Sequence, residues 1–459
     1  MYDVVIIGGG IAGLGAAWEL QTISKGSKVC LLEATERWGG KMESRTIMVD
    51  GLPFLADGGP DTLVTRKEES WKLASELGLL DQLLIPSSET KNIFVLDNGK
   101  VQAIPLTPNL FFTTPLLSWY GRLRLISEPF QPARRDDEDE SLAEFANRRL
   151  GREASEKFIG PVLGGIYNTD PAHQSIMVSS PVMRQMEKED GSLVLASMKR
   201  MFKKKTGTKK PSFINFRNGM EQFPATLAHT LTCEKRLGAF VTNIEKRNDG
   251  YSILMDGQEA IEARSVIIAT LANVACRLLG DMAPQVANGL EKIEHKNIGT
   301  ITLVYNEGAL PSAPRVNGLM IPRREQRSID AVTVTSAKLL ARSHDGYALV
   351  RVFFGGGKSE LLDLSNENLL KVIIREMESL LNIYEDPLGY EIFRWKEGFP
   401  QATVGHLDRM RGIEKNLPEG IFLAGSSYHG VAVPDCLRSA NKAARSASDF
   451  LATVLPIKP

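Results

Sequence analysis

Gly8-Gly9-Gly10-Ile11-Ala12-Gly13 is the segment whose residue types and spacing most clearly predict chemistry. It follows Tyr2–Ile7, an apolar run of strand length, and precedes a helix pattern of small residues that reaches Leu20. In this setting the first glycine allows a tight turn, the third lets the backbone approach a pyrophosphate, and the last lets the helix pack against the strand. The helix start also offers free N–H groups and a positive dipole end to phosphates. The segment therefore predicts a dinucleotide-binding site.

The residues that follow indicate which dinucleotide is bound. Val29–Leu32 is a second apolar run, and it leads to Glu33, whose carboxylate can accept hydrogen bonds from ribose hydroxyls. Arg37-Trp38-Gly39-Gly40-Lys41 comes soon after, where NAD domains usually continue with an ordinary strand and helix. A Gly-Gly-Lys turn this close to the ribose acid resembles the flavoprotein branch, so we predict FAD. Binding should be non-covalent, because no cysteine lies at a position suited to tethering a flavin.

Length and composition exclude several classes of protein. The 459 residues exceed the size of a single hydrophobic core, which predicts two or three domains. The 55 basic residues balance the 55 acidic ones, which argues against a nucleic-acid-binding protein with a broad cationic field. Four scattered cysteines without a CxxC pair favour a reducing compartment and no structural zinc. The chain starts directly with a strand and has no apolar run of about 18 residues, so we expect a cytoplasmic protein without a secretory signal or a transmembrane helix.

Helix and strand signals alternate irregularly along the chain, without an internal repeat. Ser141 and Glu144 form a capping box, and strand signals dominate residues 238–269 and 299–354. Helical patterns cover 68–80, 143–150, 369–381 and 437–451. We expect an α/β plus α+β fold, in which a Rossmann-type (GR2-like) FAD-binding domain is combined with a mixed-sheet substrate domain and a helical subdomain. The expected segments are 1–85, 212–285 and 391–459 for the FAD-binding domain, 86–211 for the helical subdomain and 286–390 for the substrate domain.

An apolar stretch punctuated by prolines, Leu106–Phe130, has aromatic side chains beside Arg122 and Arg124. One interpretation is a surface helix on a membrane interface, with the arginines reaching lipid head groups. The other is a pair of helices that covers a substrate cavity. Peripheral membrane contact is therefore one of two expectations for this segment.

The last seventy residues contain a second strand–turn–helix pattern. Phe422–Ser427 is typical of a short strand that ends in small residues, and Tyr428–Cys436 opens a helix. Backbone N–H groups at such a helix start can stabilise the negative charge that a reduced flavin carries near its N1–C2=O2 edge. Both ends of the chain therefore carry residues suited to a flavin.

These motifs together resemble the protoporphyrinogen and coproporphyrinogen oxidases of haem synthesis, within the FAD-dependent amine oxidase superfamily. The matching pieces span the chain, and they include Ile6–Gly13, Gly39–Lys41, Gly59–Asp61, Arg148–Gly151, Gly165–Tyr167, Trp395 and Tyr428–Cys436. The resemblance implies that FAD is held by Gly8, Gly9, Gly10, Ile11, Ala12, Gly13, Glu33, Ala34, Arg37, Gly40, Lys41, Gly58, Gly59, Pro60, Asp61, Val241, Trp395, Gly425, Val431, Ala432 and Val433. By the same motifs, Arg66 and Lys67 are the candidates for binding substrate carboxylates. No metal and no catalytic side chain is implied, because the flavin carries the reaction.

The reaction that the resemblance implies is oxidation of a porphyrinogen, either protoporphyrinogen IX or coproporphyrinogen III. A bridging methylene loses hydride to the flavin, and oxygen is the acceptor, giving peroxide. The protein would mainly orient the macrocycle and keep the site dry. Ferrochelatase or another haem-pathway enzyme is an implied partner. The number of substrate propionates, the physiological acceptor and the oligomeric state stay open.

The chain departs from the family pattern at three places, and the third bears on the substrate. Asn168-Thr169 replaces the usual Ala-Gly, and Ala440 stands where glycine is common. No arginine occurs at Lys91-Asn92-Ile93, where the mitochondrial and plant members place one that binds substrate. Recognition of the propionates must therefore differ.

Two other functions stay open. An amine oxidase or desaturase of the same superfamily is one, and Tyr428 could then be one of two aromatics flanking the flavin. A non-catalytic flavin-binding escort protein is the other, and it would show no oxidase turnover. His406 and His429 are the only histidines in motif-bearing segments, and we expect packing roles for both.

Overall fold

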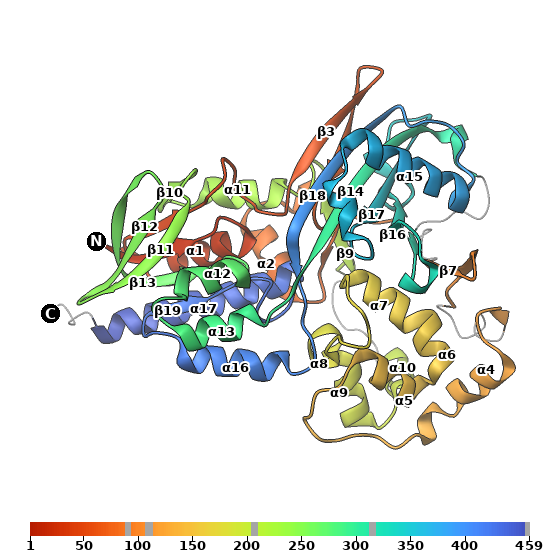
Figure 1. The fold of residues 1–459 in the computed structure, drawn as a ribbon, viewed down its shortest axis with the longest axis horizontal. Coiled ribbons are helices and arrows are strands. Elements are labelled where there is room, and N and C mark those ends of the chain that lie inside the picture. The colour runs from red at the N-terminus through yellow and green to blue at the C-terminus, as the bar shows by residue number, and fades with distance from the viewer. Residues whose placement is uncertain (88–92, 106–112, 203–209, 312–317, 455–459) are drawn as a thin grey trace.

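The computed structural model describes residues 1–87, 93–105, 113–202, 210–311 and 318–454. Figure 1 shows three regions: a sheet flanked by helices, a second sheet covered by α15, and a group of helices from α4 to α10. This mixed α/β architecture with several sheets agrees with the coarse expectation from the sequence. Within the described ranges, no helix combines the length and the apolar character needed to cross a membrane.

The first sheet has the strand order β10-β2-β1-β13-β12-β11, and β19 also pairs with β13. Its strands are β1 Tyr2–Ile7, β2 Val29–Leu32, β10 Glu234–Arg236, β11 Val241–Arg247, β12 Gly250–Met255, β13 Gln258–Ile268 and β19 Ile421–Leu423. β1 and β2 form over the two expected runs, and β1 lies between parallel neighbours. Hairpin turns connect β11 to β12 and β12 to β13, within the stretch of expected strand signals at 238–269. One sheet is thus assembled from three distant parts of the chain.

Helices cover both faces of this sheet. Val4 and Ile6 of β1 belong to the core that includes α1, α2, α11 and α17, whereas Val5 and Ile7 belong to the core that includes α12, α13 and α16. The bounds are α1 Ile11–Ile23, α2 Glu68–Glu76, α11 Gln222–Thr230, α12 Ala272–Leu279, α13 Pro284–Glu291, α16 His406–Asn416 and α17 Val433–Val454. Because both faces are covered, β1 is apolar at every position from 4 to 7.

The contact between α1 and α17 explains one departure from the family pattern. A Cβ on Gly15 would lie 2.8 Å from Leu437 and 3.4 Å from the Cβ of Ala440, so the two helices approach closely. Ala440 is fully buried there. The methyl group of Ala440 is accommodated because the residue opposite it has no side chain.

The second sheet has the order β18-β14-β17-β16-β15-β7-β8. Its strands are β7 Ile93–Asp97, β8 Lys100–Ala103, β14 His295–Asn306, β15 Gly318–Met320, β16 Ile329–Val334, β17 Tyr347–Phe354 and β18 Gly389–Pro400. Val350 and Val352 share a core with α15 (Asn366–Leu381) on one face, and Leu349 packs with the β3–β4 hairpin on the other. The expected helix at 369–381 begins three residues earlier, where Ser365 accepts a hydrogen bond from the N–H of Asn368.

Short helices make up the third region (Figure 1). They are α4 Trp119–Ile126, α5 Leu142–Leu150, α6 Arg152–Ala154, α7 Gly160–Ile166, α8 Ile176–Ser179, α9 Pro181–Asp190 and α10 Leu193–Phe202, with a π-type turn at Ser155–Ile159. The predicted capping box is confirmed: the Ser141 hydroxyl accepts from the N–H of Glu144, whose carboxylate accepts from the N–H of Ser141. Arg149 and Glu128 form an ion pair that is completely buried. Removing one partner of such a pair typically costs 3–5 kcal/mol, because the other charge stays buried.

The remaining elements are short. They are β3 Ser44–Val49, β4 Leu52–Asp57, β5 Leu63–Val64, β6 Leu83–Leu84, β9 Phe213–Phe216 and α14 Thr335–Lys338, with 3-10 turns at Leu80–Gln82, Glu128–Phe130, Glu307–Ala309, Arg323–Glu325, Leu340–Arg342 and Ser359–Asp363. The helix expected at 68–80 ends at Glu76, because Gly78 takes a positive φ of 69°.

Candidate functional site

The β1–α1 turn has the geometry that a dinucleotide cradle needs. Gly8 has a φ of 109°, and a Cβ on Gly13 would lie only 1.8 Å from the carbonyl oxygen of Gly8. Only glycine therefore allows the helix to start this close to the strand. By contrast, a Cβ on Gly10 would meet no atom nearer than 4.0 Å, so the turn borders open space on that side. This is the side from which a pyrophosphate would approach the N–H groups of α1.

Glu33 lies beside this turn, at the end of β2. Its carboxylate accepts hydrogen bonds from the N–H of Gly9 at 2.6 Å and from the N–H of Thr35 at 2.9 Å. The carbonyl oxygen of Glu33 accepts from the N–H of Ala239, which brings the start of β11 next to the predicted ribose acid. Val241 of β11 is buried. The predicted ribose and adenine residues are therefore neighbours, although they are about two hundred positions apart in the chain.

The Arg37–Lys41 loop closes over the same turn. The N–H of Gly39 donates to the carbonyl of Gly9 at 2.9 Å, and Gly39 and Gly10 form a parallel bridge. Arg37 donates to the carbonyl of Gly40 and pairs with Glu43 at 2.9 Å, which holds the loop in place. Gly40 thus adjoins the cradle at Gly10, and Arg37 holds Gly40 there.

Lys41 points away from that loop into the protein. Its ammonium donates to the carbonyl of Gly398, near the end of β18 in the second sheet. Burial lowers the pKa of Lys41 to about 8, and the neighbouring Cys436 opposes this shift. Because this pKa lies near neutral pH, the Lys41 side chain can gain or lose its proton there.

Gly58 and Gly59 are held between the two sheet regions. A Cβ on Gly58 would lie 2.3 Å from the ring of Phe393, and a Cβ on Gly59 would lie 2.0 Å from the carbonyl oxygen of Lys41. The carbonyl of Gly58 accepts from the indole N–H of Trp395 at 3.0 Å and from the hydroxyl of Thr300 at 3.2 Å. The structure therefore places the predicted residue Trp395 directly on the predicted glycine segment.

Asp61 ends this segment in a charged environment. Its carboxylate pairs with Lys338 at 2.8 Å and lies 4.0 Å from Arg351. Burial by itself raises the pKa of Asp61, but Lys338 and Arg351 outweigh this effect and hold the pKa at about 2. Sequence reasoning did not find Thr300, Lys338 or Arg351. The one available signal was an arginine in the middle of the apolar run that forms β17.

The C-terminal turn supplies the other predicted flavin residues. Gly425 has a φ of 124°, and a Cβ there would meet nothing nearer than 3.7 Å, so this turn also borders open space. Val431 and Ala432 are half-buried just before α17, and Val433 is its first residue. The carbonyl of Ala432 accepts from the N–H of Cys436 at 3.0 Å, which begins the helical hydrogen bonds. The two glycine turns, at Gly10 and Gly425, thus both offer space next to a helix start.

The two basic residues predicted to bind substrate have different surroundings. The Lys67 ammonium lies 2.5 and 2.6 Å from the two carboxylate oxygens of Asp435, in the first turn of α17. Arg66 is exposed and has no ion pair within the part of the chain that the structure describes. Lys91 and Asn92, at which the expected arginine is missing, lie outside the described residues.

Two histidines and a tyrosine of the C-terminal motifs are engaged in structural contacts. His406 is buried with a ring nitrogen 2.8 Å from the carbonyl oxygen of Tyr428, and burial lowers the pKa of His406. His429 pairs with Glu414 at 2.7 Å. Tyr428 is fully buried, and its hydroxyl donates to the carbonyl of Thr270. Tyr428 therefore presents no ring to the open space at Gly425.

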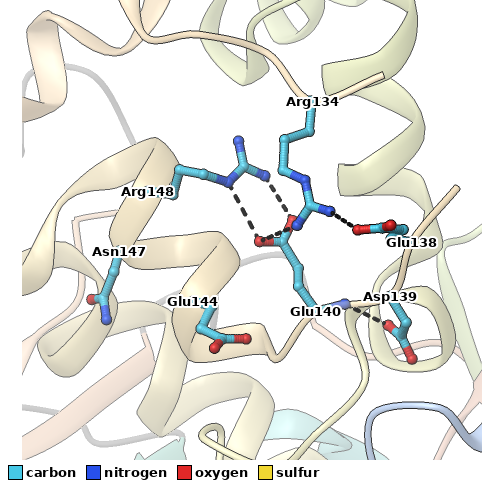
Figure 2. A pocket seen from close by; sticks show the side chains of 7 residues that line it. All are labelled: Arg134, Glu138, Asp139, Glu140, Glu144, Asn147 and Arg148. Atoms are coloured by element: carbon cyan, nitrogen blue, oxygen red, sulfur yellow. Dashed lines mark hydrogen bonds and ion pairs between the residues drawn. The ribbon is translucent and has the colours of Figure 1, made fainter. Parts of the chain in front are cut away.

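Figure 2 shows a hollow in the helical region, where Arg134 and Arg148 both point toward Glu140. The hollow has a volume of about 720 Å³ and is lined by Arg134, Glu138, Asp139, Glu140, Glu144, Asn147 and Arg148. Arg148 lies 2.7 Å from Glu140, and Arg134 lies 3.6 Å from it. Because its cations are already paired and it contains none of the predicted cofactor residues, this hollow is not the flavin site. A second hollow, of about 410 Å³, lies between α16, β19 and α17.

Comparison with known proteins identifies the family. The profile of the flavin-containing amine oxidoreductases matches residues 11–447. The chain belongs to this family. It is therefore a flavin-dependent oxidoreductase, and its dinucleotide turn fits the FAD form of the cofactor.

Individual relatives show the same likeness over the full length. Coproporphyrinogen III oxidase of Bacillus subtilis is 29% identical, over 98% of this chain and 98% of its own. Protoporphyrinogen oxidase 2 of Arabidopsis thaliana is 26% identical, over 98% and 94%. The crystal structure of a protein described as a putative protoporphyrinogen oxidase, from Exiguobacterium sp. 255-15, has a TM-score of 0.85 at 28% identity and covers 98% of this chain and 99% of its own. Cyclohexylamine oxidase of Brevibacterium oxydans, at 18% identity and a TM-score of 0.71, shares the fold.

Proposed function

We propose that this protein is an FAD-dependent oxidase that converts a porphyrinogen, protoporphyrinogen IX or coproporphyrinogen III, to the porphyrin in haem synthesis. The observation that carries the proposal is the Gly58–Asp61 segment, which is clamped between the Lys41 loop and Trp395. This segment contains Gly-Pro-Asp, which, like the Val-Pro-Asp-Cys turn at 433–436, is more specific to the porphyrinogen branch of the resemblance than the N-terminal glycine motif is. Support also comes from full-length similarity to proteins named as coproporphyrinogen III oxidase and protoporphyrinogen oxidase.

The proposal assigns a role to each region of the fold. The first sheet and its helices would be the Rossmann-type FAD-binding domain, built from 1–85, 212–285 and 391–459. The second sheet would form the substrate domain, mainly 286–390, with strands added from the flanking segments at β7, β8 and β18. The helices of 86–211 would be the third subdomain. The glycine turns at Gly10 and Gly425 fit the cofactor, since both border space that a side chain would fill.

The residues that would hold FAD are those brought together above. The N–H groups of α1 would bind the pyrophosphate, Glu33 would bind the ribose, and Val241 would lie at the adenine. Gly58, Trp395 and the start of α17 would surround the isoalloxazine ring. A bound flavin supplies hydride acceptance from a bridging methylene and electron transfer to oxygen, which yields peroxide.

The protein itself would orient the reacting groups and keep water out of the reacting centre. Trp395 and Thr300 fix the carbonyl of Gly58, and Phe393 packs against the same glycine. Apolar and aromatic groups at that point exclude water from the reacting centre. No acid–base pair is needed, and His406, whose burial lowers its pKa, would stay neutral and structural.

Propionate binding by Arg66 and Lys67 remains part of the proposal. Arg66 is exposed and could reach a carboxylate directly. Lys67 is paired with Asp435 in the structure, so a substrate carboxylate would have to compete with that pair. This geometry favours Arg66 over Lys67 as the first contact.

One experiment tests the substrate class. The flavin-loaded protein is mixed anaerobically with each porphyrinogen while flavin absorbance is followed, and oxygen is then admitted. We expect bleaching with at least one porphyrinogen, followed by porphyrin fluorescence and peroxide. Robust turnover of amines with none on porphyrinogens would replace the proposal with an amine oxidase. Absence of bleaching with porphyrinogens, amines and carotenoids would favour a flavin-binding escort protein.

We also propose a surface contact for the segment that leads into the helical region. Trp119, Tyr120 and Phe130 are 71%, 66% and 87% exposed, and the described part of 106–130 therefore presents aromatic groups to solvent. Residues 106–112 of this segment lie outside the described ranges. Such a surface suits peripheral contact with an anionic membrane, or with a haem-pathway enzyme such as ferrochelatase that receives the product.

A further inference from the structure

Arg351 is a buried cation outside the proposed set of cofactor-binding and substrate-binding residues. It lies at the middle of β17, and its side chain is 3% exposed. One of its terminal nitrogens donates to the carbonyl of Gly59 at 2.6 Å. Its Nε and Nη1 atoms have no hydrogen-bond partner among the described residues. Burying polar N–H groups without hydrogen-bond partners costs folding free energy, so a structural role alone does not account for Arg351.

The charges around Arg351 do not balance. Arg342 pairs with Asp57 at 3.3 Å, so each of those two charges has a partner. Asp61 is shared by Lys338 at 2.8 Å and Arg351 at 4.0 Å. Among these described residues, the cations are Arg342, Lys338 and Arg351. The carboxylates are Asp57 and Asp61, so one positive charge is left uncompensated. Lys338 is the closer partner of Asp61, so the surplus charge resides mainly on Arg351.

The surplus charge lies directly behind the clamped glycine segment. Arg351 reaches the carbonyl of Gly59 from the β17 side, whereas Trp395 and Thr300 hold the carbonyl of Gly58. The guanidinium also lies over the ring of Phe353, 4.6 Å from its centre, which fixes its orientation. Little water screens a charge this deeply buried, so its field extends to whatever occupies the space on the other side of the segment.

We propose that Arg351 is a positioning residue that holds the Gly58–Asp61 segment and whose uncompensated charge raises the reduction potential of the bound flavin. This inference rests on the proposed flavin site. A positive charge near the ring favours the reduced cofactor, because reduction adds negative charge to it. This role accounts for the retention of a buried arginine with two unpartnered nitrogen atoms.

The test measures the flavin equilibrium and not turnover. Wild type, Arg351→Met and Arg351→Lys are loaded with FAD, and each is titrated anaerobically against a reference dye of known potential. We expect the equilibrium constant for flavin reduction to fall at least tenfold in Arg351→Met, which corresponds to about 30 mV for a two-electron couple. Arg351→Lys keeps the charge, so its constant should stay within threefold of wild type. A purely structural arginine would make the two variants equally defective.

A matched control comes from β18, a strand of the same sheet that β14 separates from β17. Arg394 of β18 is also an arginine with an unpartnered Nε and one hydrogen bond to a main-chain carbonyl, that of Leu364. It alternates with Phe393, which packs toward the glycine segment, and therefore points to the opposite face of the sheet. Arg394→Met should leave the equilibrium constant unchanged.

A second variant keeps the inference testable if Arg351→Met does not fold. Lys338→Met removes a cation whose side chain is 26% exposed, and among the described residues Arg351 is then the one cation that still pairs with Asp61. The cluster would be neutral, so flavin reduction should again become less favourable, by a factor of at least three. An unchanged constant in a folded, FAD-loaded variant at either position would overturn the inference. The titration uses no porphyrinogen, so a wrong substrate assignment would not affect it, whereas a wild type that binds no FAD would overturn the proposed function as well.

Discussion

Replacement of Glu33 tests the cofactor site most directly. Its carboxylate is half-buried at the end of β2 and already accepts hydrogen bonds from the N–H groups of Gly9 and Thr35. An ionised carboxylate has acceptor positions left for the ribose hydroxyls of FAD. Glu33→Ala removes these acceptors, whereas Glu33→Gln keeps the shape of the side chain and removes its charge.

The expected loss of FAD affinity follows from the strength of a hydrogen bond to a charged group. A hydrogen bond to a charged group contributes about 1.5–3 kcal/mol, which corresponds to a factor of about 10 to 150 in affinity. We therefore expect the Kd for FAD to rise at least tenfold in Glu33→Ala. The rise should be smaller in Glu33→Gln, because one amide oxygen can still accept.

Fluorescence titration of the apoprotein with FAD measures these constants. Glu36→Gln is the matched control, since it changes the same charge in the same loop at an exposed residue. Its Kd should stay within about threefold of wild type, because an exposed ionic group contributes 1 kcal/mol or less. If Glu33→Ala and Glu36→Gln bind FAD equally well, the assignment of the ribose site is wrong.

Three further predictions concern the membrane, the substrate and acid stability. The protein should co-sediment with anionic vesicles and lose this property when Trp119 and Tyr120 are both changed to Ser; a protein that stays wholly in the supernatant would rule out the membrane contact of this segment. Changing Arg66 and Lys67 together to Gln should raise KM for a porphyrinogen while flavin content stays unchanged; each exposed contact would contribute about 1 kcal/mol or less, and an unaltered KM would exclude both residues. Asp61→Asn should remove roughly 2 kcal/mol of unfolding free energy at pH 7, since the folded pKa of Asp61 is depressed to about 2 from its usual 3.8. That contribution is fully present above about pH 4 and is lost as the pH falls through about 2, so the difference between the two proteins in urea unfolding should be roughly threefold smaller at pH 2.5 than at pH 7.

The β1–α1 turn shows what local sequence can determine. Its strand, glycines and helix start are contiguous, and their conformations are set by side-chain size and hydrogen bonds within a few residues. The Ser141 capping box is local in the same sense, and it forms as predicted. The end of the helix expected at 68–80 was missed by a few residues. There, Gly78 could stop the helix or be tolerated within it, and local propensities alone do not distinguish these outcomes.

The assembly of distant segments was decided by the tertiary structure. β7 pairs in parallel with β15, more than two hundred residues away, and a periodic pattern does not state which strand will be a neighbour. Lys67 illustrates the same limit for the site, because its partner Asp435 is fixed only when α17 packs against the N-terminal region. Backbone conformation depends on near neighbours in sequence, whereas charge pairing depends on packing. The sequence by itself therefore determined the cofactor motifs and several elements, and only the folded chain placed Lys338 and Arg351 at Asp61.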